Sequence, residues 1–285
     1  MLRVPRNDKE GDSVRRRIIV TLVVAIAAIS ALISLNPWGL IQSFFSTSIT
    51  AGIAVSFSII VIARQRASGL FGRTHLALAI GLAFWFAGQV IWAAEMTTSG
   101  REPSDLSAAD IPWLALYVPF GYYILMTYRH FGKTVTKYHL VIVAGIVAVL
   151  TFSAVYTAYF FYKHSMVQGG NSGEQPSMLV ATIRSAYPLG DAVLVVPAIL
   201  LLITLRKGML TYTPWLFVAS ALILVSVADM LFTNMALLNR TDLSGYAYTL
   251  YNAGNLAFAG GLYWYNRFVI FNAKWVIEEF QRANR

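Results

Sequence analysis

Apolar residues along the chain gather into eight segments, which are separated by short stretches rich in charged and polar residues. A helix needs roughly 20 predominantly apolar residues to cross the hydrocarbon core of a bilayer, and the segments are close to that length. The pattern therefore predicts an all-α polytopic membrane protein with eight transmembrane helices, at residues 18–35, 45–63, 75–95, 111–128, 138–162, 180–205, 213–238 and 246–270.

The eight segments form one transmembrane domain, residues 18–270, between a basic tail, residues 1–17, and an amphipathic tail, residues 271–285. The first segment resembles the apolar part of a signal peptide, but no convincing cleavage site follows it. We therefore expect the first segment to remain in the protein as an uncleaved anchor.

Composition supports a membrane location, because 57% of the residues are hydrophobic and only 12% are charged. The chain has no cysteine, which excludes disulfides, thiolate metal sites and cysteine nucleophiles. A net charge of +9 could indicate nucleic-acid binding. However, most lysines and arginines fall in alternate loops, as the positive-inside rule requires. We expect a multi-pass protein of the cell membrane, with both termini in the cytoplasm, the lipid bilayer as its partner and no nucleic-acid partner.

Two parts of the sequence read alike, residues 45–95 and residues 180–238. Each contains an apolar helix, a basic turn with a glycine (Gly69 or Gly208) and a second helix that ends in polar residues. Aligning the two glycines brings Glu95 opposite Asn234. The copies lie four spans apart and so have one orientation, which indicates two parallel four-helix halves. Membrane composition alone could produce the same similarity.

Polar residues within the segments occur at similar depths, in the halves of the spans that the charge pattern places outside. Charged side chains in a span usually face the bundle interior or a water-filled cavity. Since the inner halves contain almost nothing ionisable, we predict one outer polar pocket above an apolar inner plug. Four acids against one arginine would favour a cation or hydrogen-bond donors. The candidate ligand-binding residues are Gln89, Glu95, Asp110, Arg184, Tyr187, Asp191, Asp229, Asn252 and Asn255.

Several of these residues also have a structural interpretation. Arg184 and Asp191 could form an ion pair at the membrane edge, where a long arginine side chain reaches the interface. Asp110 fits the N-cap of a helix. Asn252 and Asn255 could join neighbouring helices through hydrogen bonds.

Other chemistries lack their characteristic residues. The four histidines are predicted in loops or at helix ends, and none has a second ligand at a spacing typical of zinc sites. The sequence has no G-x-S-x-G motif and no glycine-rich phosphate loop. The interior of segment 246–270 has no lysine that could form a retinal Schiff base. We expect no metal and no cofactor.

The stretch "GLAFWFAGQVIWAAEMTTSGREPSDLSAADIPWLALY", residues 81–117, resembles part of the multi-span sensory regions of prokaryotic histidine kinases and diguanylate cyclases. "YPLGDAVLV", residues 187–195, is similar to a later segment of the same regions. The resemblance implies a sensor, although this sequence carries no kinase or cyclase domain. The matching residues of the first stretch are Trp85, Trp92, Glu95, Pro103, Ser104, Ala109, Asp110, Trp113, Leu114 and Tyr117.

The stretch "ALILVSVADMLFTNMALLN", residues 221–239, is similar to a late helix of the lysoplasmalogenase family, eight-span enzymes that cleave the vinyl-ether bond of lyso-lipids. The resemblance places Asp229 at the family's acidic position, whereas the family's earlier Gly-Asp falls here on Gly88-Gln89. Vinyl-ether hydrolysis needs a proton donor and a base for water. Glu95 or Asp191 would therefore have to supply the second carboxyl group.

Together these features favour a sensor-type membrane protein that binds a small or lipid-like ligand in the outer pocket. The ligand would signal through the last span and its tail to a cytoplasmic partner or within a homodimer. Two alternatives remain open. One is an intramembrane ether-lipid hydrolase with Asp229 as its catalytic acid or base, and the other is a transporter, which the internal repeat favours.

Overall fold

The computed structural model describes residues 8–35, 39–65, 69–100, 106–131, 178–204, 212–237 and 244–270, with isolated positions between 141 and 163. Within these ranges every regular element is a helix, which confirms the all-α class. The elements are α1 (Asp8–Leu35), α2 (Gly39–Gln65), α3 (Gly69–Ser99), α4 (Asp110–Ala115), α5 (Tyr117–Phe131), α7 (Met178–Thr204), α8 (Tyr212–Leu237), α9 (Ser244–Trp264) and the π-helix η2 (Tyr265–Ile270).

These helices coincide with the predicted apolar segments wherever the structure describes them. Helix α1 begins at Asp8 and so includes part of the predicted basic tail. Most of the segment 138–162 and all of the tail 271–285 lie outside the described residues. Four helices are long and apolar enough to cross a membrane: α2 over Phe45–Gln65, α3 over Phe71–Ser99, α7 over Thr182–Ile203 and α8 over Thr213–Thr233.

The predicted span 111–128 is two helices, because the chain breaks at Leu116 between α4 and α5. Pro119 explains the break, since proline has no N–H group to donate to the carbonyl of Ala115 four residues earlier. The helical path continues around this missing bond. Leu116 donates to the carbonyl of Pro112, and Phe120 donates to that of Leu116, both at 3.1 Å.

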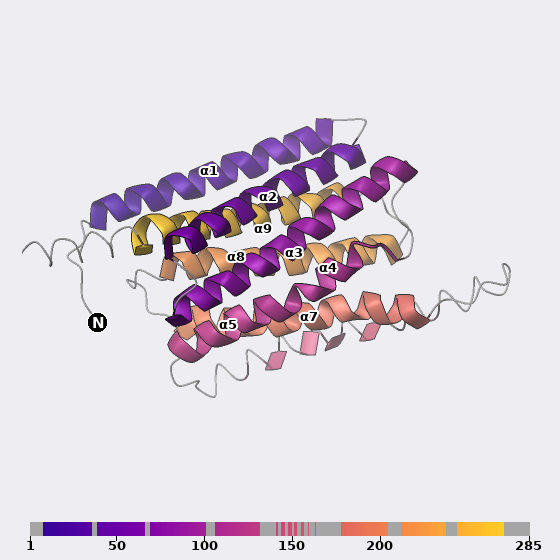
Figure 1. The fold of residues 1–285 in the computed structure, drawn as a ribbon. Helices are drawn as coiled ribbons and strands as arrows, with labels where there is room; N and C mark the ends of the chain where they lie inside the picture. The colour runs from indigo at the N-terminus through magenta and orange to yellow at the C-terminus, as the bar shows by residue number, and fades with distance from the viewer. Residues whose placement is uncertain are drawn as a thin grey trace, which may run out of the picture.

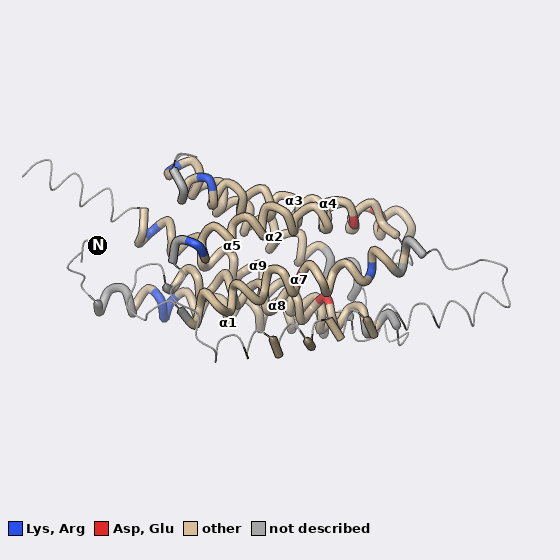
Figure 2. The backbone as a smooth tube through the Cα atoms, turned by 90° about the horizontal axis from the view of Figure 1, so that it is seen from below, with Lys and Arg blue, Asp and Glu red and all other residues tan. Residues whose placement is uncertain are grey.

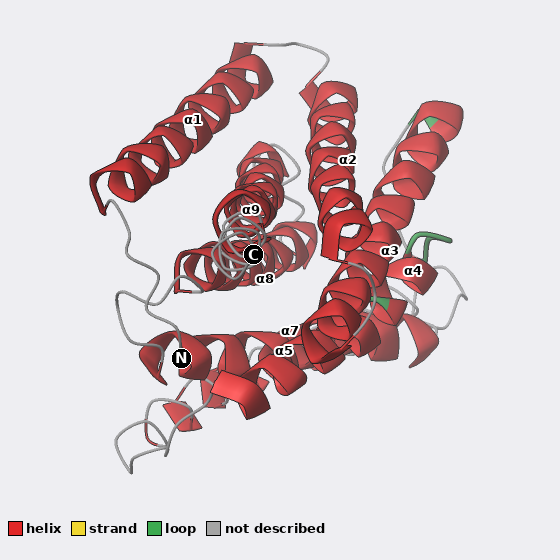
Figure 3. Ribbon diagram, turned by 60° about the vertical axis from the view of Figure 1, so that its left-hand side comes forward, coloured by secondary structure: helices red, strands yellow, loops and turns green. Residues whose placement is uncertain are grey.

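Six of the described helices contact one another in a closed ring. Figure 1 and Figure 3 show them packed in one bundle. Neighbours in the ring are α2, α3, α5, α7, α8 and α9, and α9 packs against α2 to close it. The short helix α4 contacts both α3 and α7, while α1 lies outside the ring against α9 and α2. Because α1 covers its outer side, α9 is buried along nearly its whole length. This position explains how α9 tolerates asparagines and glycines that would be costly in a lipid-facing helix.

Glycines allow the closest approach between α8 and α9. A Cβ atom at Gly254 would lie 2.8 Å from Val225, and one at Gly261 would lie 3.1 Å from Phe217 and from the carbonyl oxygen of Pro214. Small residues at helix contacts bring backbones together and increase van der Waals packing, which drives association in lipid.

Basic residues gather at one end of the bundle (Figure 2). They come from the start of α1, the end of α2, the start of α3, the end of α5 and from η2. Arg64 at the end of α2 donates a hydrogen bond of 3.1 Å to Asn266 of η2, which joins two of these helix ends. The gathered residues are Arg15, Arg16, Arg17, Arg64, Arg73, Arg129 and Arg267.

Replacement of Gly81 by alanine tests the packing of α3 against α5. The new Cβ atom would lie 2.1 Å from the ring of Phe120, which is only 5% exposed and has little room to move. We expect Gly81→Ala to lower the free energy of unfolding by about 1–3 kcal/mol, the usual cost of overpacking a core. Thermal unfolding of the purified protein in detergent would measure this change.

Gly121→Ala on α5 is the matched control, because no heavy atom lies within 4 Å of its Cβ position. Alanine should leave stability unchanged or raise it there. Equal melting temperatures for the two variants would contradict the close contact between Gly81 and Phe120.

Candidate functional site

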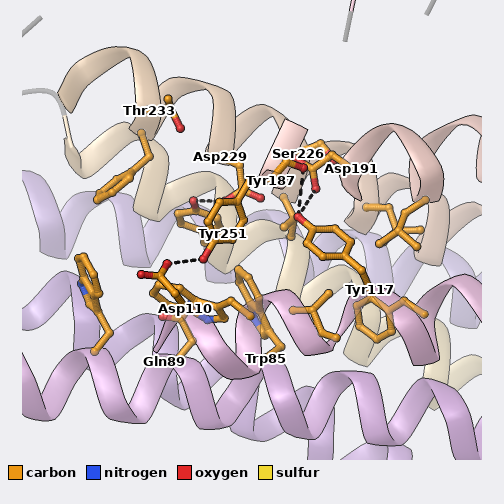
Figure 4. Close-up of a pocket in the computed structure, with 18 of the residues that line it drawn as sticks. Trp85, Gln89, Asp110, Tyr117, Tyr187, Asp191, Ser226, Asp229, Thr233 and Tyr251 are labelled. Atoms are coloured by element: carbon orange, nitrogen blue, oxygen red, sulfur yellow. Dashed lines mark hydrogen bonds between the residues drawn. The ribbon is translucent and has the colours of Figure 1, made fainter. Parts of the chain in front are cut away.

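A cavity of about 80 Å³ lies inside the helix ring, and all but one of the ring helices contribute to its lining. Figure 4 shows its polar side chains converging from α3, α4, α5, α7, α8 and α9. Of the predicted site residues, the ones that line the cavity are Gln89, Asp110, Arg184, Tyr187, Asp191 and Asp229. We call this space the ring cavity.

Two carboxyl groups from neighbouring helices meet at one side of the ring cavity. Asp191 of α7 is 3% exposed, and its carboxyl group lies beside Asp229 and Ser226 of α8 (Figure 4). The Tyr117 hydroxyl donates a hydrogen bond of 3.0 Å to Oδ1 of Asp191, and the Tyr251 hydroxyl donates one of 2.5 Å to Oδ1 of Asp229. Oδ2 of Asp191 is buried and has no hydrogen-bond partner among the described residues.

Asp110, the third acid of the ring cavity, combines two contacts. It is the first residue of α4, and its Oδ2 accepts a hydrogen bond of 2.9 Å from the backbone N–H of Ser107. The N-cap position of α4 is Ala109 and has no side-chain cap, so Asp110 is not the N-cap expected from the sequence; its carboxyl group closes the turn that precedes the helix instead. Its Oδ1 accepts a hydrogen bond from the Tyr187 hydroxyl of α7. Asp110 therefore joins α4 to α7 at the cavity wall.

Arg184 lines the same cavity one turn before Tyr187 on α7. The hydrogen bonds to Asp191 come from Tyr117, and Arg184 acts electrostatically on the Tyr187 hydroxyl. The sequence suggested Asp191 as the ion-pair partner of Arg184, and that pairing stays a prediction.

Aromatic rings from α3, α4 and α9 line another part of the ring cavity. Ring centroids of Trp85 and Trp113 lie 6.2 Å apart, those of Trp92 and Trp113 lie 5.4 Å apart, and those of Trp85 and Tyr251 lie 5.6 Å apart. The four residues line the cavity and form one continuous wall, which we call the aromatic wall. Gly88 makes room for it, because a Cβ atom there would lie 2.2 Å from Nε1 of Trp113.

Glu95 lies outside the cavity lining. Its carboxyl group accepts hydrogen bonds from the Ser107 hydroxyl at 2.6 Å and from the Ala108 backbone N–H at 3.0 Å. These contacts fasten the turn before α4 to the end of α3. Glu95 therefore positions the segment that carries Asp110.

Asn252 and Asn255 also lie outside the cavity lining, although both are fully buried. Asn252 accepts a hydrogen bond of 2.7 Å from Thr50 and donates one of 2.9 Å to Ser46. Asn255 accepts one of 2.8 Å from Nε1 of Trp85 and donates one of 3.1 Å to Thr50. The two amides join α9 to α2 and α3, which is the structural alternative stated for them above.

Sequence reasoning missed three cavity residues that the structure brings to the acids, Tyr117, Ser226 and Tyr251. A signal was present for two of them. Tyr251 precedes Asn255 by four positions, and Ser226 precedes Asp229 by three, so each shares a helix face with a candidate residue. Tyr117 appeared only among the residues of the sensory-region resemblance.

A second cavity, of about 20 Å³, lies in the half of the bundle where the sequence predicted almost nothing ionisable. It lies where α3 and α8 begin and where α5 and α9 end, and it contains the buried side chain of His75. The imidazole stacks on Tyr265 with centroids 4.1 Å apart, and its Nδ1 is 2.9 Å from the carbonyl oxygen of Phe71. The sequence placed His75 at a helix end, but α3 begins at Gly69, so His75 lies within the helix.

The ring cavity can perform two kinds of chemistry. Two adjacent carboxyl groups in a desolvated space repel one another when both are ionised and nothing lies between them. The pair is therefore suited to holding a cation, or to holding a proton that can be transferred to a bound molecule. Hydroxyl groups that donate to both acids fix their orientation for either task.

Asp191→Asn tests whether the acid pair lowers the stability of the protein. A site kept for function often lowers stability, whereas a structural contact raises it. An amide would remove a buried carboxyl group with an unpartnered oxygen and could donate to Asp229. We expect the melting temperature of the variant to rise. Ser56→Ala, on the exposed side of α2, should leave it unchanged, and a fall for Asp191→Asn would indicate a structural role for this acid.

No protein-family model, no curated protein and no solved structure matches this chain. The two resemblances found in the sequence therefore stay predictions, and the residues of the ring cavity are the basis on which a function can be proposed.

Proposed function

We propose that this chain is a receptor-like integral membrane protein that binds a small ligand in the ring cavity and signals to a cytoplasmic partner. The unpartnered buried oxygen of Asp191 carries this proposal. Ionisable groups inside a span are costly and mark ligand or ion sites by default. A bound molecule would supply the missing hydrogen bond and remove the cost of burying the acid without one.

The position of the cavity supports signal transmission through α9. Tyr248, Tyr251 and Phe258 of α9 line the ring cavity, and η2 continues the same helix to the basic end of the bundle. A ligand that displaces the Tyr251 hydroxyl from Asp229 would alter contacts of α9 directly. The change could then reach the residues that follow η2.

Eight spans with both termini in the cytoplasm are part of the proposal. Clustered basic residues at one end of the bundle favour that end as the cytoplasmic one. The four most apolar helices are α2 with α3 and α7 with α8, the same two pairs that read alike in the sequence. This correspondence favours two parallel halves.

Single-cysteine labelling tests this topology with little background, because the natural chain has no cysteine. We expect a cysteine at Ala67 or Thr134 to react with a membrane-impermeant maleimide only after intact cells are opened. A cysteine at Asp105 or Thr241 should react in intact cells. The reverse labelling pattern would contradict the proposed orientation, and identical labelling of all four would contradict alternating loops.

A second candidate function is hydrolysis of an ether lipid, which the contact between Asp191 and Asp229 favours. One carboxylic acid would protonate the β-carbon of a vinyl ether, and the other, as a carboxylate, would take a proton from water as it attacks the resulting oxocarbenium. The hemiacetal formed would then separate into an aldehyde and an alcohol. Asp191 thus supplies the second carboxyl group that the lysoplasmalogenase resemblance lacks at Gln89.

Turnover of lyso-ether lipids by the purified protein separates the two functions. The proposed receptor should release no aldehyde from a panel of vinyl-ether lyso-lipids, because it binds its ligand without chemistry. Aldehyde release that falls at least about 100-fold in Asp229→Asn, the low end for loss of one acid–base group, would identify a hydrolase instead. Ser56→Ala is the control, since α2 contributes no residue to the cavity lining and the Ser56 hydroxyl bonds only to its own helix.

A further inference from the structure

We infer that the ligand of the ring cavity carries an ammonium group. The inference rests on the proposed ligand-binding function and specifies its chemical class. Four features of the ring cavity support this inference: its charge, its hydrogen-bonding groups, its aromatic surface and its size.

The charged residues of the lining favour a cation. Asp110, Asp191 and Asp229 lie in the lining with a single arginine, Arg184. The acids stand on α4, α7 and α8, so carboxyl groups reach the cavity from three helices (Figure 4). Desolvation within the helix ring strengthens the attraction between these carboxylates and a positive charge.

Two buried polar atoms of the cavity lining have no hydrogen-bond partner among the described residues, the acceptor Oδ2 of Asp191 and the donor Nε1 of Trp113. The hydroxyl groups of Tyr117, Tyr187 and Tyr251 already donate to the three acids. Oδ2 of Asp191, an acceptor, is left without a partner in the described part of the chain. An ammonium N–H group placed there would complete its hydrogen bonding, whereas an anion would meet the carboxylates as a like charge.

The aromatic wall suits the alkyl substituents of such a cation. Trp85, Trp92, Trp113 and Tyr251 present contiguous ring surface at the ring cavity. Ring faces attract cations through the aromatic quadrupole, and tryptophan does so most strongly. Aromatic cages of this kind recognise substituted ammonium ions, so the wall and the acids favour the same ligand.

The size of the ring cavity limits the group that it encloses. An engineered protein cavity of roughly 150 Å³ holds benzene, which has six heavy atoms. The ring cavity of about 80 Å³ is therefore suited to a group of three to five heavy atoms, such as a methylated ammonium. Among the described residues no three histidine, aspartate or glutamate side chains are grouped to hold a metal ion.

Three probes of equal size and different charge test the inference: trimethylammonium, isopropanol and acetate, each with four heavy atoms. Tryptophan fluorescence reports binding, because three tryptophans form most of the aromatic wall. Titrations would use the full chain in a maltoside detergent, at constant ionic strength set with sodium chloride. We expect trimethylammonium to bind at least about tenfold more tightly than isopropanol, the fold-change of one desolvated cation–π contact, and acetate to bind most weakly.

Variants then assign the preference to the acids. Asp191→Asn and Asp229→Asn should each weaken trimethylammonium binding about tenfold or more, as expected when a buried charge pair is lost. Their isopropanol binding should change little, which also shows that the cavity is folded. Ser56→Ala, on the ring helix α2 that does not line the cavity, should keep the binding of the natural chain, because the Ser56 hydroxyl bonds only to the Gly52 carbonyl of its own helix.

Comparison of the three probes on the natural chain tests the inference without any variant. Equal or tighter binding of isopropanol or acetate would overturn the ammonium class and leave a ligand-binding cavity of another kind. No response to any of the three probes in a folded sample would overturn the proposed function as well. Tighter competition by lysophosphatidylethanolamine, whose headgroup ammonium has N–H groups, than by free trimethylammonium would identify a lipid headgroup as the source of the ammonium, and weaker competition would identify a free cation.

Discussion

Hydrogen bonding of α9 to α2 and α3 is the constraint on which the rest of the bundle depends. In an apolar environment an unsatisfied amide costs several kcal/mol, because no water replaces the missing partner. Asn252 and Asn255 are fully buried, so α9 must stand where Thr50 and Trp85 can meet them. That position closes the helix ring, and the ring in turn encloses the cavity.

The sequence predicted where the described helices lie along the chain, but it did not predict which helices are neighbours in the bundle. Length and hydropathy determine which segments can lie in a membrane, and the described helices follow those segments closely. Which helix lies beside which depends on local shape, such as Gly254 and Gly261 where α9 meets α8. Hydropathy placed the start of the third helix at residue 75, and therefore His75 at a helix end. The helix begins at Gly69, so His75 lies inside the helix ring.

The candidate site shows the same division. Charged residues inside apolar segments stand out in a sequence, and Asp110, Asp191 and Asp229 proved to line one cavity. The tyrosines that bind those acids did not stand out, because tyrosine is common near membrane surfaces and its partner depends on neighbouring helices. Asparagine was ambiguous in the sequence, since an amide can serve a ligand or a neighbouring helix equally well. The hydrogen bonds of Asn255 to Trp85 and Thr50 favour the role of joining neighbouring helices.

The place of α9 at the end of the described chain has a consequence for how the protein is made. Thr50 and Trp85 are synthesised long before Asn255, so the ring stays open between α2 and α8 until α9 enters the membrane. At roughly 5–20 residues per second, the interval between Trp85 and Asn255 is on the order of ten to thirty seconds. During biogenesis the unfinished ring therefore presents unpaired polar groups to the surrounding lipid. A ligand can be enclosed only after α9 has entered the membrane.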